Sequence, residues 1–153
     1  MTDLVTNGTI APLKLEEFLP YRLEMLSGLV SQGLAQIYEG FDLGFCEWQL
    51  LMTLGEVITT TATAFGARNR MHKTRVSRAV SVLLSRGLVR RIASRTDMRQ
   101  APLQLSPQGE QLYNQMAPLV REYLASLQNE LSSEEQAVLD RSLTRLTERS
   151  QRL

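Results

Sequence analysis

Apolar residues recur at the spacing of an α-helix along most of the chain. The first such segment runs from Lys14 to Tyr38, where Pro20 predicts either a short first piece or a kink. Before it, residues 1–12 mix Thr, Asn, Gly and Pro and predict a loose arm. Further helices are predicted over 47–58, 61–69, 72–86, 107–131 and 133–149. The chain is therefore predicted to be mainly α-helical.

Several of these helices carry their own start and stop signals. The Thr61 side chain can accept a hydrogen bond from the first turn of the helix that follows it. Ser106 precedes Pro107, a residue favoured at the first helical position, and Ser132 opens an S-x-x-E capping box. Gly87 is expected to end the helix before it, because glycine adopts a positive φ without strain.

A short β-hairpin is predicted directly after Gly87. Leu88–Ile92 has the composition of a strand, residues 94–99 form a polar loop, and Leu103–Leu105 alternates as a returning strand. Pro102 has no N–H for a β-ladder, but it is tolerated because both strands of an isolated hairpin are edge strands. The predicted fold class is mainly α with a small β-hairpin wing.

The net charge of +1 hides two opposed blocks. Ten of the 17 basic residues and one of the 16 acidic residues lie between Arg68 and Arg99, so this stretch carries +9 and the rest of the chain −8. The polar face of its helix bears short side chains and one arginine, namely Thr74, Ser77, Arg78, Ser81 and Ser85. A concentrated cationic surface on an otherwise acidic protein favours nucleic-acid binding, and a major groove admits one helix. A solvated charged face is the simpler alternative.

Several motifs in this stretch resemble the winged helix-turn-helix of the MarR family of bacterial regulators. In chain order they are His72-Lys73-Thr74-Arg75-Val76-Ser77-Arg78, Gly87-Leu88-Val89-Arg90, Asp97-Met98-Arg99 and Leu105-Ser106-Pro107-Gln108-Gly109. The resemblance implies a single domain over 1–153, with a DNA-binding lobe at 47–105 and N- and C-terminal dimerisation helices at 13–38 and 107–149. The terminal helices also hold more leucine than one small core requires, which favours a twofold interface.

The same resemblance implies a homodimeric repressor that binds a palindromic operator in double-stranded DNA. The helix that begins near His72 would read the major groove, and the hairpin tip would reach the minor groove. The DNA-binding residues expected on this basis are Lys73, Thr74, Arg75, Ser77, Arg78, Arg95, Asp97 and Arg99.

MarR-type regulators are expected to release DNA when a small molecule binds between the dimer helices and the DNA-binding lobe. Here the candidate residues offer aromatic walls and a cationic anchor for an acidic group: Tyr21, Arg22, Tyr38 and Trp48. The segment Phe18-Leu19-Pro20-Tyr21-Arg22-Leu23 is also similar to the opening of regulators that answer to aromatic acids or their CoA thioesters. The alternative is that these aromatic side chains are ordinary core.

Two other hypotheses stay open. Cys46 lies near the start of a helix, where the dipole can favour a reactive thiolate, so a redox-sensing regulator is one alternative. A buried, inert cysteine beside Trp48 is the simpler interpretation. The second alternative is a winged-helix module that binds protein or RNA instead of duplex DNA.

Length, composition and the absence of some motifs narrow the classes of protein to which this chain can belong. A chain of 153 residues fits one domain, and it has no apolar run of the ~20 residues that span a membrane. It opens without a signal-peptide pattern, and its single cysteine excludes an internal disulfide, so a cytoplasmic location is expected. It has no nucleophile, phosphate-loop or zinc motif, so we expect neither an enzyme nor a metal or cofactor.

Overall fold

The computed structural model describes residues 5–6, 9–92 and 100–152, with side chains from residue 11 onward. The chain forms two compact units, residues 1–34 and 35–153.

The first unit begins with two short strands. β1 (Val5–Thr6) pairs antiparallel with β2 (Thr9–Ile10), so the prediction of a loose arm is wrong for these four residues. A 3₁₀ turn, Leu15–Glu17, then precedes the long helix α1 (Leu19–Glu39). Pro20 lies in the first turn of α1, where its missing N–H has no helical acceptor to lose. The predicted short first piece is therefore confirmed.

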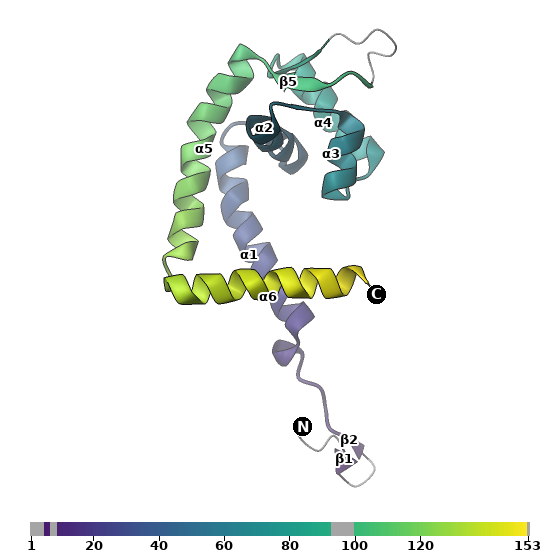
Figure 1. Cartoon of the computed structure of the whole chain (residues 1–153), viewed down its shortest axis with the longest axis vertical. Coiled ribbons are helices and arrows are strands. Elements are labelled where there is room, and N and C mark those ends of the chain that lie inside the picture. Colours follow the sequence, from purple (N-terminus) through teal and green to yellow (C-terminus); the bar gives the residue numbers. More distant parts are fainter. Residues whose placement is uncertain (1–4, 7–8, 93–99, 153) are drawn as a thin grey trace. The chain divides into compact units, whose positions relative to one another are not determined.

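The second unit contains the end of α1 and all later elements (Figure 1). In chain order these are α2 (Phe45–Val57), β3 (Thr59–Thr60), α3 (Ala62–Asn69), α4 (Lys73–Ser85), β4 (Val89–Arg91), β5 (Leu103–Leu105), α5 (Pro107–Gln128) and α6 (Ser133–Gln151). The predicted mainly helical fold with a small β-structure is thus confirmed.

α2 forms the centre of the lobe, because it packs against α4, α5 and β5. Its side chains Leu50, Leu51 and Leu54 are buried, whereas Trp48 and Met52 are half-buried. Each neighbouring element contributes large side chains to the same core: Phe65 from α3, Val76, Val80 and Leu83 from α4, Leu103 from β5 and Met116 from α5. This shared core fixes α4 on the lobe by its apolar side.

The predicted helix caps are present in the structure. The Thr61 side chain accepts from the Ala64 N–H, and Gly87 has φ +68° after the end of α4. Ser106 caps α5 by accepting from Gly109, and Ser132 opens a complete capping box at the start of α6. Each local signal therefore marks a real helix boundary.

The sheet has one strand more than predicted. Its order is β3-β5-β4, so β5 is the central strand and the prediction of an isolated hairpin is wrong. Ile58, with φ +67°, turns the chain from α2 into β3 beside β5. Pro102 immediately precedes β5, and it contributes its carbonyl, which accepts from the Ile92 N–H. The proline is tolerated because it lies outside the ladder.

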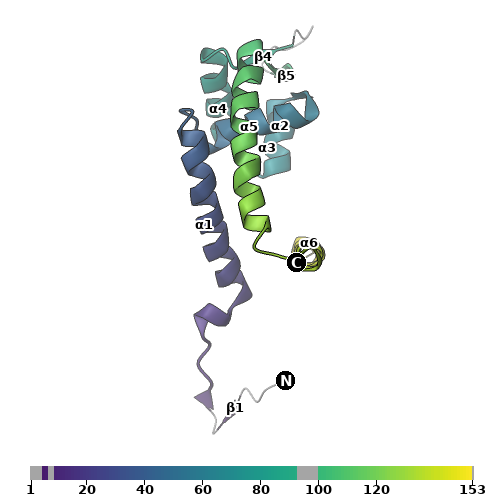
Figure 2. The same ribbon diagram turned by 90° about the vertical axis from the view of Figure 1, so that its left-hand side faces the viewer.

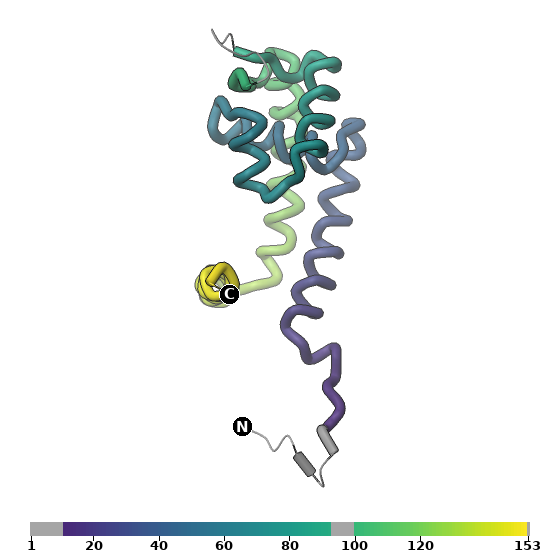
Figure 3. The backbone as a smooth tube through the Cα atoms, turned by 90° about the vertical axis from the view of Figure 1, so that its right-hand side faces the viewer, coloured from purple at the N-terminus to yellow at the C-terminus, as the bar shows by residue number. Residues whose placement is uncertain are grey.

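α5 starts beside the sheet and runs away from the lobe, and α6 begins at its far end (Figures 1 and 2). The backbone tube shows α6 nearly end-on, well separated from α2, α3 and α4 (Figure 3). No residue of α6 is buried within this chain. Of the helices described, none combines the length and the apolarity needed to cross a membrane.

Candidate nucleic-acid interface

α4 presents a polar face to solvent because its apolar face is fixed in the core. Val76, Ala79, Val80 and Leu83 are buried, while the predicted contact residues Lys73, Thr74, Arg75, Ser77 and Arg78 are all exposed. His72 is the N-cap of this helix, but its side chain makes no capping hydrogen bond. The structure therefore brings the helical part of the predicted DNA-binding set onto one accessible surface.

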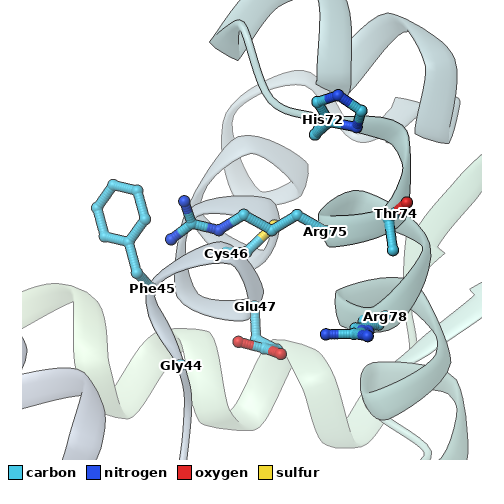
Figure 4. A pocket seen from close by; sticks show the side chains of 8 residues that line it. All are labelled: Gly44, Phe45, Cys46, Glu47, His72, Thr74, Arg75 and Arg78. Carbon is cyan, nitrogen blue, oxygen red and sulfur yellow. The ribbon is translucent and has the colours of Figure 1, made fainter.

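Two hollows flank α4. The first, of about 580 Å³, lies between the start of α2 and the first turns of α4. Figure 4 shows Arg75 reaching from α4 toward the Phe45 ring, while the Arg78 guanidinium faces the Glu47 carboxylate. The arginines that line this first hollow come from α4, and its acidic residue, Glu47, comes from α2.

The second hollow, of about 750 Å³, lies between α3, α4 and the base of the wing. Lys73, Ser77, Ser81, Arg91 and Gln100 line it. These side chains carry two cations and three uncharged hydrogen-bonding groups, a combination suited to a phosphate backbone and its adjoining groove. The polar face of α4 thus separates two concave surfaces.

Three arginines of the cationic stretch are bound within the protein. The Arg68 guanidinium forms an ion pair with Glu56 at 3.2 Å. Arg86 donates to the backbone carbonyls of Asp42 at 2.7 Å and Phe41 at 3.1 Å, and Arg90 donates to the Gln104 side chain. The sequence did not reveal these roles, because the acceptors lie between 12 and 45 residues away along the chain.

The other predicted contacts, Arg95, Asp97 and Arg99, lie outside the described residues. Their assignment to the minor groove therefore stays a prediction.

Tyr38 and Trp48, two of the predicted ligand residues, lie together. Their rings stack at 5.3 Å between centroids, and both contact Phe45, at 6.4 and 5.8 Å. Burial raises the pKa of Tyr38, with a smaller increase from Glu39 and an opposing effect of Arg75. The sequence missed Phe45 as the third member of this aromatic cluster, because it placed the start of α2 two residues too late. Tyr21 is half-buried and Arg22 exposed, both in the first unit.

Cys46 is a core side chain. It is 5% exposed, and its thiol donates to the Met71 sulfur at 3.4 Å. Burial raises the pKa of this thiol, Glu47 raises it further, and Arg75 opposes both. A protonated, enclosed thiol is a poor nucleophile, so the geometry favours the inert interpretation over redox sensing.

Comparison with known proteins agrees with this architecture. Residues 41–100, which contain α2, α3, α4 and β4, match the MarR family. This match covers 60 of the 153 residues, so the central part of the chain is similar to the MarR family.

Solved structures extend this MarR-family likeness over most of the chain. A MarR family transcriptional regulator from Silicibacter pomeroyi DSS is 23% identical, with a TM-score of 0.76 over 91% of this chain and 93% of that one. A probable transcriptional regulator from Pseudomonas aeruginosa is 26% identical, with a TM-score of 0.74 over 87% and 99% of the two chains. A mutant MarR from E. coli, complexed with operator DNA, is 19% identical, with a TM-score of 0.73 over 84% and 92%. No match was found among curated proteins.

Proposed function

We propose that this chain is a transcriptional regulator of the MarR type, which acts as a homodimer and inserts α4 into the major groove of a palindromic operator. The observation that carries the proposal is the division of α4 into a buried apolar face and an exposed face with Thr74, Ser77 and Arg78. Short hydroxyl side chains allow a helix to lie close to base edges, and an arginine can bind phosphate or guanine. The similar E. coli structure, which is complexed with operator DNA, supports operator binding.

Exposed apolar side chains on the terminal helices support the proposed dimer. They include Leu23, Leu26 and Leu29 on α1, Leu119, Leu124 and Leu127 on α5, and Val138, Leu139, Leu143 and Leu146 on α6. Large apolar side chains left exposed in this number favour a protein interface. Two recognition helices related by a twofold axis would then reach half-sites about 34 Å apart.

Because α6 contributes nothing to the core of its own chain, its removal tests the dimer without removing core side chains. Deletion of residues 132–153 should give a folded monomer that binds DNA weakly. Light scattering measures the mass, and circular dichroism measures the remaining helix. A truncated protein that stayed dimeric would contradict this assignment of α6.

We propose further that the protein is a repressor, which is released from DNA when a small aromatic acid or its CoA thioester binds near Tyr38 and Trp48. The stacked Tyr38 and Trp48 rings support an aromatic site. The Trp48 indole N–H is buried without a hydrogen-bond partner among the described residues, so it is a donor that a ligand oxygen could accept from. Release requires that the ligand bind the DNA-incompetent state more tightly.

A salt titration tests DNA binding before any operator is known. The probe is a random-sequence duplex of about 30 base pairs, long enough for two half-sites one turn apart. Arg78→Ala should weaken binding and reduce the salt slope by about 0.9 for each lost phosphate contact, or about 1.8 for a dimer. The matched control is Arg152→Ala, which removes an equally charged residue that forms an ion pair with Glu148 near the C-terminus. Binding of single-stranded RNA in preference to every duplex would favour the RNA-binding alternative.

A further inference from the structure

Among the predicted DNA contacts that the structure describes, Arg75 is the one paired with an aromatic ring. Its guanidinium carbon lies over the Phe45 ring, 5.6 Å from the centroid. Phe45 is the first residue of α2 and Arg75 lies in the first turn of α4, so the contact joins two helices at the mouth of the first hollow (Figure 4).

The Phe45 ring, over which Arg75 lies, is held in place by two other aromatic side chains. Phe45 is 37% exposed, and it contacts Tyr38 at an interplanar angle of 63° and Trp48 at 44°. Tyr38 is buried, and Trp48 is half-buried on the helix whose leucines form the core. Phe45 is therefore a fixed platform at the protein surface.

A guanidinium that lies over a ring keeps its N–H donors, because the attraction uses the π-face and not the in-plane hydrogens. Within the described part of the chain, the Arg75 side chain makes no hydrogen bond and no ion pair, in contrast to the side chains of Arg68, Arg86 and Arg90. Its donors thus stay available while its long side chain is restricted. Such restriction lowers the entropy that a flexible arginine loses when it binds a ligand.

We propose that Phe45 is a positioning residue for DNA binding, which holds Arg75 ready to contact a backbone phosphate. This inference rests on the proposed function, because it requires that α4 bind DNA. It adds to that function a residue outside the recognition helix that acts only through Arg75. It also joins the predicted ligand residues Tyr38 and Trp48 to a DNA contact through one ring.

A double-mutant cycle tests the proposal, with Phe45→Leu, Arg75→Ala and the double variant. The probe is the same random duplex at several salt concentrations, and thermal unfolding verifies the fold of each variant. Arg75→Ala should reduce the salt slope by about 0.9 per contact, or about 1.8 for a dimer. Phe45→Leu should weaken binding about two- to five-fold for each subunit and leave the slope unchanged, because the phosphate contact itself remains.

The double variant should bind like Arg75→Ala alone, since Phe45 then has no arginine to position. Phe45→Tyr retains the ring face and should restore the affinity that Phe45→Leu loses. Because Trp48 is the only tryptophan, its fluorescence independently reports whether the cluster stays packed in each variant.

Two results would overturn this inference. Equal binding by wild type and Phe45→Leu would remove the positioning role. If Phe45→Leu also weakens DNA binding when Arg75 is already alanine, the effect comes from packing of the lobe and not from Arg75. If Arg78→Ala still lowers the salt slope in either case, the proposed function stands and only the role of Phe45 falls. If the wild-type protein binds no duplex, the proposed function itself fails.

Discussion

The Ser106 side chain forms hydrogen bonds both to Gly87, after the end of α4, and to the first turn of α5. Its replacement by alanine should therefore lower the stability of the fold. Its hydroxyl accepts from the Gly109 N–H at 3.0 Å and donates to the Gly87 carbonyl. The backbone N–H of Ser106 also donates to the Leu88 carbonyl at 3.0 Å. With the residue only 7% exposed, water cannot readily replace the two side-chain hydrogen bonds.

Ser132→Ala provides a matched control for Ser106→Ala. Loss of an N-cap costs about 1 kcal/mol. A buried donor and acceptor left unpaired add about 1–2 kcal/mol, so Ser106→Ala should lower the free energy of unfolding by about 2–3 kcal/mol. Ser132 caps α6 in the same way but is exposed, with its hydroxyl 3.3 Å from the Glu135 N–H. Ser132→Ala should cost only about 0.5–1 kcal/mol.

Urea unfolding at one fixed protein concentration measures the difference. With a slope of about 2 kcal/mol per molar urea, Ser106→Ala should move the midpoint down by about 1–1.5 M and Ser132→Ala by at most about 0.5 M. Ser106→Thr, which keeps a hydroxyl, should recover most of the loss. Equal shifts for the two alanine variants would refute the reasoning, because burial and the bridge to Gly87 would then add nothing to the cap.

Two further predictions follow from contacts around α4. Arg86→Ala should lower the free energy of unfolding by about 1 kcal/mol, because the Arg86 side chain donates to two backbone carbonyls of the α1–α2 turn. Arg90→Ala loses one exposed hydrogen bond to Gln104 and should cost less than about 0.5 kcal/mol in the same urea assay. Equal costs would contradict the anchoring role of Arg86. The raised pKa of Cys46 leaves less thiolate at any given pH, so alkylation by iodoacetamide at pH 8 should be at least about ten-fold slower in native than in urea-unfolded protein. The native rate should also keep rising with pH above the ordinary thiol value, where the rate of the unfolded protein levels off. Equal native and unfolded rates would support redox sensing instead.

Local signals predicted the fold well because each has a short-range physical cause. Thr61, Gly87, Ser106 and Ser132 mark helix boundaries through hydrogen bonds or φ values that involve neighbours within four residues. The apolar stripe of α4 likewise predicted which face is buried. These features depend little on how distant segments meet.

What the sequence did not predict depends on distant segments. β3 is only two residues long, and Thr59-Thr60 becomes a strand because β5 lies beside it. The start of α2 was placed at Glu47 instead of Phe45, so the ring that contacts Arg75 was not recognised. The need for glycine at position 109 also depends on a distant segment. A Cβ at Gly109 would overlap the Leu88 carbonyl oxygen, which comes close only in the folded structure.

The arginines show why a count of charges predicts a binding surface but not its contacts. A guanidinium that bonds neutral carbonyls, as Arg86 does, keeps its full charge and still attracts DNA from a distance. The same residue is held by the α1–α2 turn and is therefore a poor candidate for a phosphate contact. Arg68 is different again, because Glu56 neutralises it locally. The salt dependence of binding counts the phosphates that are neutralised in the complex. The number counted for each chain should therefore be smaller than the nine net charges that the stretch from Arg68 to Arg99 carries.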